Sequence, residues 1–106
     1  IGDTQTASIT GATTLDFATH QNFVLTLTGA VTLSNPSTES AGQSGFIVFI
    51  QDGTGNRTVS PSGTDYETAG GSGLTLSTAA SARDVVPYVV SATGSIILGS
   101  PTLAVS

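Results

Sequence analysis

The amino-acid sequence predicts an all-β fold, in the form of an antiparallel, jelly-roll-like β-sandwich of about eight or nine short strands. Helix-favouring side chains are scarce, because Lys and Met are absent and Thr, Ser, Val, Ile and Gly dominate the chain. Turn signals recur about every eight to twelve residues, a spacing typical of sandwiches and barrels. The run Phe46–Ile50 is apolar and β-branched or aromatic at every position, which predicts a central strand with both faces buried.

The first third of the chain contains four segments with strand character. Thr4–Thr10 and Ala12–Ala18 read as two short strands separated by a glycine. Asn22–Thr28 alternates apolar and polar residues, and Val31–Ser34 follows after the small pair at Gly29. This arrangement predicts a half-buried hairpin between the last two segments.

The middle of the chain predicts a loop, a core strand and a return strand. Asn35–Ser44 is rich in turn residues, and we expect it to carry the chain from one sheet to the other. Asp52–Asn56 supplies residues that tolerate a positive φ, as a hairpin turn requires. We therefore expect Arg57–Ser60 to return beside Phe46–Ile50.

Residues after the return strand are less regular. Pro61–Gly73 is the longest irregular stretch, and we expect it to be mobile or to contact a neighbouring molecule. Leu74–Ser77 reads as a short strand, and Thr78–Ala82 is the one place where a helical turn fits.

The last part of the chain predicts a second hairpin. Asp84–Ala92 and Ser95–Leu98 form its strands, and Pro87 indicates that the first of them lies at a sheet edge or carries a bulge. The length fits a single domain. The domain is expected to span residues 1–106, with arms at 1–10 and 99–106, the latter adding a final strand to this or another subunit.

Composition excludes several partners. Two arginines, no lysine and a net charge of −5 cannot form the basic patch that nucleic acid or an anionic membrane surface requires. No cysteine is present, so disulfides and thiolate metal sites are excluded. The surface is expected to consist largely of neutral hydroxyls from 18 Thr and 14 Ser, which suits contact with other protein copies.

Residues that could carry chemistry are few. His20 is the only imidazole, it lies at a predicted turn, and no Ser has the Gly-x-Ser-x-Gly spacing of hydrolases. Asp52, Thr54 and Asn56 have the alternate spacing of calcium ligands, but the later Gly and Glu of such a loop are missing, so a hairpin turn is favoured. The sequence predicts a protein that is not an enzyme and holds no cofactor or metal.

Five side chains are candidate contacts for a partner or a glycan. Asp65 and Glu67 flank Tyr66, which makes this loop the best sugar-contacting cluster in the chain, although a solvated loop explains it equally well. Arg57 and Arg83 are the only cations, and either could reach a carboxylate of a partner.

Three blocks together resemble a β-sandwich domain of tailed-bacteriophage virion proteins: Asn22–Pro36, Ala41–Ser60 and Leu74–Val86. Domains of this kind occur in tail fibres, head fibres and capsid decoration proteins, and they tend to form trimers. The chain departs from the commoner pattern at Pro61–Tyr66, where related domains often carry a Trp.

The resemblance implies a place on the exterior of the virion. Because the chain is a bare domain, we expect a capsid decoration or cement protein that stabilises the shell as a homotrimer in contact with the major capsid protein or other virion proteins. The alternative is a tail or head fibre or spike domain that binds a host glycan or receptor through Asp65–Glu67.

Overall fold

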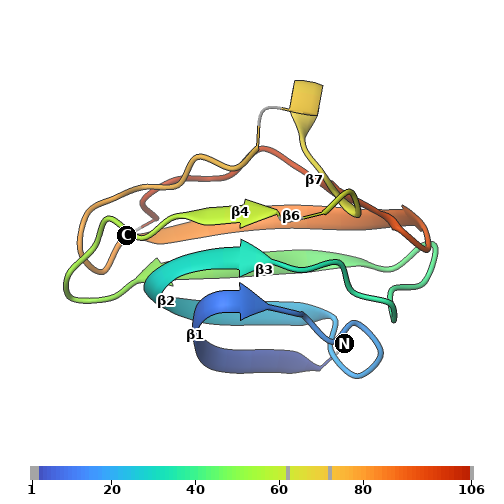
Figure 1. Cartoon of the computed structure of the whole chain (residues 1–106), viewed down its shortest axis with the longest axis horizontal. Coiled ribbons are helices and arrows are strands. Elements are labelled where there is room, and N and C mark those ends of the chain that lie inside the picture. The colour runs from blue at the N-terminus through green and yellow to red at the C-terminus, as the bar shows by residue number, and fades with distance from the viewer. Residues whose placement is uncertain (1–2, 62, 72, 106) are drawn as a thin grey trace.

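The computed structural model describes residues 3–61, 63–71 and 73–105 and shows strands curled into one mixed sheet (Figure 1). The strands are β1 Thr4–Thr13, β2 Asn22–Leu33, β3 Ser44–Gln51, β4 Val59–Pro61, β5 Tyr66–Glu67, β6 Arg83–Ala92 and β7 Ser95–Leu98, and Ala69–Gly71 forms a 3₁₀ turn, η1. The sheet order is β1-β2-β3-β6-β7-β5, and β4 pairs with β2. The described residues include no helix long and apolar enough to cross a bilayer.

The all-β class is confirmed, whereas the antiparallel sandwich is replaced by a sheet of mixed direction. Strand β2 runs parallel to β1, β3 and β4, and β5 runs parallel to β7. Among the strands that the structure describes, the β3–β6 and β6–β7 pairs are antiparallel. The sheet closes on itself in part, so one layer of strands bends around the core in place of two separate sheets.

The bend in β2 produces this curl. Its first half pairs with β3, and its second half, Val31–Leu33, pairs with β4. The predicted hairpin at Gly29 is therefore wrong, because the chain bends there without reversing. A Cβ at Gly29 would overlap Oγ1 of Thr10 on β1, so glycine lets the two strands approach closely at the bend. Strand β1 bends alongside β2 through a bulge at Gly11, whose φ is 67°.

The core lies inside the curled sheet. Strand β2 contributes Phe23, Leu25 and Leu27, which confirms the alternation expected for Asn22–Thr28. The predicted strand Ala12–Ala18 is wrong beyond residue 13, but Leu15 and Phe17 still point into the core from the connection that follows β1. The Phe17 ring contacts the ring of Tyr88 on β6 edge to face, with centroids 5.3 Å apart.

Strand β3 contradicts the prediction that both faces of Phe46–Ile50 are buried. Ile47 and Phe49 point inward and are 0% and 1% exposed, whereas Phe46 points outward and is 40% exposed. The reason is topological, because the sheet is covered on its inner face only. Both faces of this strand are apolar, and the described chain covers one.

The segments around β4 also differ from expectation. Residues 52–56 form the predicted turn, but the chain does not return beside β3, since β4 pairs with β2 across the core. Leu74–Ser77 is irregular, although Leu74 and Leu76 pack on the core. Thr78–Ala82 contains a turn in which Ala82 N donates to Ala79 O at 3.2 Å, and it is not a helix.

Strand β6 is central, so the predicted edge position of Pro87 is wrong, and the bulge given as the alternative lies between Val90 and Ala92, away from Pro87. Pro87 O accepts a hydrogen bond from Gly99 N at 2.8 Å, so the backbone of Pro87 faces the C-terminal tail and not β3. The N–H group that proline lacks is therefore not needed for the β3–β6 pairing, which continues through Pro87. The tail continues along β6 through a bridge between Val85 and Thr102. The expected final strand is thus a short bridge to the same chain, and residues 4–10, expected as an arm, belong to β1.

Candidate functional site

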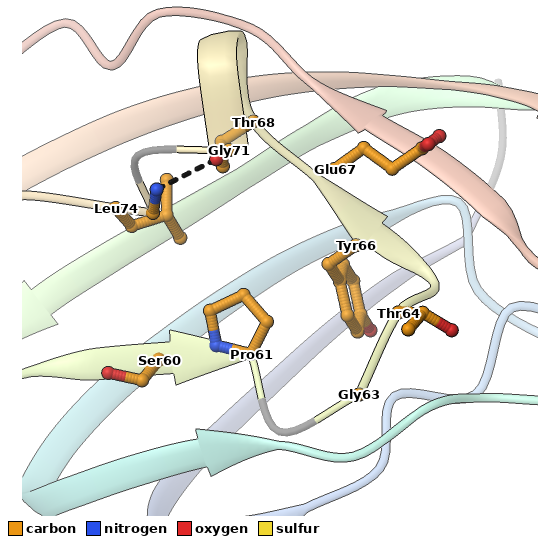
Figure 2. Close-up of a pocket in the computed structure, with 10 residues that line it drawn as sticks. Ser60, Pro61, Gly63, Thr64, Tyr66, Glu67, Thr68, Gly71 and Leu74 are labelled. Carbon is orange, nitrogen blue, oxygen red and sulfur yellow. Dashed lines mark hydrogen bonds between the residues drawn. The ribbon is translucent and has the colours of Figure 1, made fainter.

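A pocket of about 650 Å³ lies where the curled sheet fails to close (Figure 2). Strand β4 pairs only with β2, and β5 pairs only with β7, so within the described residues β4 and β5 present unpaired edges toward the gap. The pocket is lined by Ser60, Pro61, Gly63, Thr64, Tyr66, Glu67, Thr68, Gly71, Gly73 and Leu74. We call it the seam pocket.

The loop between β4 and β5 is fixed by a side chain from a distant segment. Asn35 Oδ1 accepts a hydrogen bond from Asp65 N at 3.0 Å. A Cβ at Gly63 would overlap the Asn35 amide, so this close approach requires glycine. Ile96 N donates to Asp65 O at 2.7 Å and starts the β5–β7 pairing. The predicted irregular stretch therefore forms an ordered wall of the pocket in its described part.

Tyr66 belongs to both the core and the pocket. The side chain is only 5% exposed, and its ring packs 6.5 Å from that of Phe17. The described chain offers its hydroxyl no hydrogen-bond partner. Burial raises the pKa of the Tyr66 hydroxyl well above its ordinary value of 10.0, with the nearby carboxyls of Glu39 and Asp65 acting in the same direction, so the phenol is neutral.

Thr68 and Glu67 form the polar rim of the seam pocket. Thr68 Oγ1 accepts a hydrogen bond from Gly73 N at 2.8 Å, and its carbonyl accepts one from Gly71 N at 2.9 Å. Glu67 is exposed on β5 and accepts a hydrogen bond from the Ser95 hydroxyl. The rim therefore offers hydroxyls, a carboxylate and backbone edges, with no positive charge.

Asp65 turns from the pocket toward Glu39, a residue that the sequence analysis did not select. Glu39 is 3% exposed, and its Oε2 accepts a hydrogen bond from Gly94 N at 2.9 Å. Desolvation, followed by the negative charge of Glu39, raises the pKa of Asp65 above its ordinary value of 3.8. Glu39 thus holds the β6–β7 turn, while its charge opposes ionisation of Asp65, and Glu39 is too enclosed to act with Asp65 on a substrate.

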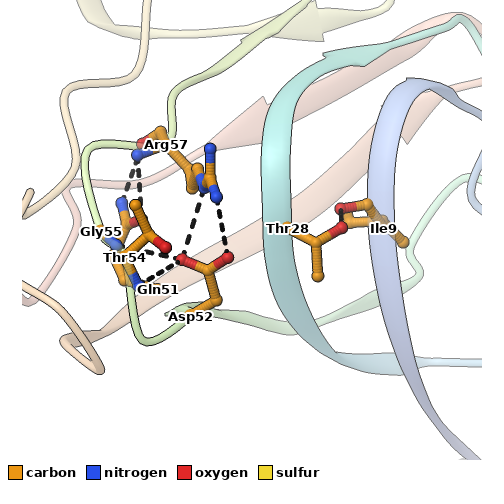
Figure 3. Close-up of polar contacts among 7 residues, drawn as sticks. All are labelled: Ile9, Thr28, Gln51, Asp52, Thr54, Gly55 and Arg57. Carbon is orange, nitrogen blue, oxygen red and sulfur yellow. Dashed lines mark hydrogen bonds and ion pairs between the residues drawn. The ribbon is translucent and has the colours of Figure 1, made fainter.

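Arg57 lies away from the seam pocket, in the turn after β3 (Figure 3). Its guanidinium pairs with Asp52 at 3.0 Å, and Asp52 Oδ1 also accepts hydrogen bonds from Thr54 N and Gly55 N. The pKa of Asp52 lies below its ordinary value, mainly because its carboxylate accepts a hydrogen bond from Arg57 and secondly because it accepts one from Gly55 N. The spacing of Asp52, Thr54 and Asn56 thus belongs to a turn, as expected, but the turn is not that of a hairpin, because β4 pairs with β2 and not with β3. The same figure shows Thr28 Oγ1 donating to Ile9 O at 3.1 Å near the bend of β1 and β2.

The remaining candidates lie elsewhere. Arg83 is exposed at the start of β6, and its side chain makes no hydrogen bond or ion pair with the described residues. The Nδ1 atom of His20 lies 3.0 Å from Thr19 Oγ1 in the connection before β2, as expected of a polar loop residue. In the ranges that the structure describes, no three His, Cys, Asp or Glu side chains are grouped to hold a metal ion.

The fold and the seam pocket define an all-β domain suited to binding or assembly. Residues 4–95 match the family described as "Putative phage tail fibre C-terminal domain". The chain therefore belongs to this family of phage tail fibre domains, which are structural proteins of the virion and not enzymes. Neither the curated proteins nor the solved structures gave a match.

This membership corrects the choice between positions in the particle. It supports the fibre alternative and gives no support to the predicted capsid decoration or cement role. A folded domain of this size suits either position, so the argument from length did not discriminate between them.

Proposed function

We propose that this tail fibre domain contacts the host surface and that the seam pocket binds a neutral saccharide there. The pocket wall carries the observation that supports this function: hydroxyls of Ser60, Thr64 and Thr68 alternate with the apolar surfaces of Pro61 and Leu74. A sugar ring likewise combines hydroxyl edges with apolar C–H faces, so this mixture of groups suits it.

The charges around the pocket favour an uncharged sugar. Glu67 is the only charged side chain among the lining residues, and the whole chain carries a net charge of −5. Anionic sugars would meet repulsion from Glu67 without a compensating cation, because Arg57 is paired with Asp52 in the turn after β3. Asp65, expected to touch the sugar, faces Glu39 and in this proposal positions the loop.

The pocket can be tested by filling it. Ser60 is exposed on β4 and lines the pocket, so Ser60→Trp would occupy the cavity without removing a buried contact. Thr6→Trp places the same side chain at an exposed position of β1 and serves as the matched control. We expect the purified chain to bind host cells and neutral oligosaccharides, with affinity about tenfold weaker in Ser60→Trp and unchanged in Thr6→Trp.

Two results would contradict this function. One is binding of anionic but not neutral oligosaccharides by the unaltered chain. The other is equal binding by the unaltered chain and Ser60→Trp. The homotrimer and the contacts with other virion proteins stay predictions.

A further inference from the structure

A continuous apolar surface covers the outside of the sheet, on the face opposite the core. It consists of Val24 on β2, Phe46, Val48 and Ile50 on β3, Val85, Pro87 and Val89 on β6, and Ile97 on β7. We call it the outer apolar face. The strand register joins these residues, because Val24 pairs with Val48, Val48 with Val85, Phe46 with Pro87, and Val89 with Ile97.

The outer apolar face is open to solvent at its largest side chains. Phe46, Val89 and Ile97 are 40%, 43% and 44% exposed. A shallow groove of about 270 Å³ runs beside them, lined by Pro87, Tyr88, Val89, Ile97 and Gly99. Exposed apolar patches that span several strands are uncommon on isolated soluble domains and typically mark an interface.

The sequence of the two central strands gives the same indication independently. Strands whose two faces are both apolar normally lie between two covering layers. In β3 and β6 the inner layer is the core of this chain, whereas none of the described residues forms an outer layer. A layer that covers this outer face therefore has to come from outside the described residues.

The placement of charges favours a second copy of this chain as that layer. Each chain carries a net charge of −5, so two copies repel each other unless they meet where carboxylates are absent. No acidic side chain lies within the outer apolar face: Asp84 on β6 points inward and is buried. This face is thus a region where two acidic copies can approach closely.

The borders of the face carry charges of opposite sign. Arg83 is the outward residue next to Val85 on β6, and it is exposed without a side-chain partner among the described residues. Glu67 on β5 pairs in register with Ile97 and is also exposed. A second copy can therefore supply a carboxylate for Arg83 while the apolar residues cover one another. Hydroxyl side chains of β1, such as Thr6 and Ser8, complete a polar rim of the kind that surrounds most interfaces.

We propose that copies of this chain associate through the outer apolar face, with Arg83 of one copy paired to Glu67 of another. This inference does not rest on saccharide binding, because none of the apolar residues of the outer face lines the seam pocket. Glu67 borders both surfaces, so the Phe46 and Val89 variants test association without altering the pocket. The resemblance implies three copies, and the measured mass decides their number.

Sedimentation equilibrium of the full chain tests the association. We expect a mass that is a multiple of 10.5 kDa for the unaltered chain and a shift to 10.5 kDa for Phe46→Glu and for Val89→Glu. Ser37→Glu adds the same charge at an exposed position in the connection between β2 and β3, outside the outer apolar face and its rim, and should leave the mass unchanged. Circular dichroism and thermal unfolding show whether each variant is folded, and the milder Phe46→Ser, which adds no charge, repeats the test if a Glu variant unfolds.

The charge pair is tested by exchange. Arg83→Glu should weaken association about tenfold, and Arg83→Glu combined with Glu67→Arg should restore it. Association through this face is overturned if the unaltered chain remains at 10.5 kDa at all concentrations, or if folded Phe46→Glu and Val89→Glu keep the mass of the unaltered chain. The pairing is overturned if the double variant associates no better than Arg83→Glu.

Discussion

The two faces of strands β3 and β6 carry similar side chains in different surroundings. On the inner face, Ile47, Phe49 and Val86 are almost fully removed from water. On the outer face, Phe46 and Val89 keep two fifths or more of their surface exposed. The comparison shows that apolar sequence identifies a strand that needs two covering layers but does not identify which layer belongs to the same chain.

The largest effect expected from this comparison is on unfolding of the isolated chain. Phe49→Ala should lower the free energy of unfolding by about 3–5 kcal/mol, because it leaves a cavity in the core. Phe46→Ala, three residues earlier on the opposite face, should cost less than about 1 kcal/mol. Urea denaturation at a concentration where the chain is monomeric measures both, and equal losses would contradict the assignment of inner and outer faces.

A second prediction concerns the bend that gives the sheet an inner face. Gly29→Ala should destabilise the chain by about 1–3 kcal/mol, since the new Cβ overlaps Thr10 Oγ1 and either the Thr10 side chain or the two strands must shift. Gly53→Ala is the control, because no atom lies within 4 Å of a Cβ built there. Thermal unfolding of the two variants provides the measurement, and a Gly29→Ala variant as stable as Gly53→Ala would argue against the close approach of β1 and β2.

Adjacent residues of β6 allow a polar version of the same comparison. Asp84 points inward, where its carboxylate accepts hydrogen bonds from Ser77 N at 2.6 Å and Ala104 N at 2.8 Å. Asp84→Ala should cost about 1–3 kcal/mol because two backbone donors lose their partner. Arg83→Gln, one residue earlier and outward, should change the stability of the monomer by less than about 0.5 kcal/mol. Denaturant titration measures the loss of stability in both variants, and a larger loss in Arg83→Gln than in Asp84→Ala would refute the inward orientation of Asp84.

The smallest expected effects are those of pH on stability through two carboxyl groups, Asp52 and Asp65. The pKa of Asp52 is lowered in the folded chain, so its stabilising contribution exists above the ordinary pKa of 3.8 and is lost as pH falls through the lowered value. The pKa of Asp65 is raised, so its contribution exists below 3.8 and is lost as pH rises through the raised value.

Thermal unfolding from about two units below to about three units above the ordinary aspartate pKa of 3.8, that is from about pH 2 to about pH 7, separates the two carboxyls. At pH 7, Asp65→Asn should raise the melting temperature, because it removes repulsion with Glu39, and Asp52→Asn should lower it, because it removes the pair with Arg57. Melting temperatures at pH 7 that shift in the opposite directions would contradict the two assignments.

Local patterns predicted much of the fold. The alternation of Phe23, Leu25 and Leu27 gave the inner face of β2 correctly, and the residues around Asp52 gave the turn. The small residues Gly29 and Ala30 led to the wrong prediction of a hairpin turn, because small residues favour turns locally. In the structure Gly29 lies against Thr10 of β1, and the strand bends there without reversing. The partner of β4 was not predictable either, since its pairing with β2 joins residues far apart in the sequence.

The candidate site was predictable only where its residues are neighbours in the sequence. Tyr66 and Glu67 line the seam pocket, as an aromatic residue beside a carboxylate suggested. Ser60 and Glu39 were missed, because each reaches the site or its support from another segment of the chain and neither stands out among neighbouring polar residues. Arg57 was selected for its charge alone, and that charge is used within its own turn.

Oxidative footprinting at increasing protein concentration tests most directly whether another copy covers the outer apolar face. The account predicts that labelling of Phe46 and Ile97 falls as concentration rises, while labelling of Leu103, which is exposed outside this face, stays constant. Labelling of Phe46 and Ile97 that stays as constant as that of Leu103 would contradict it.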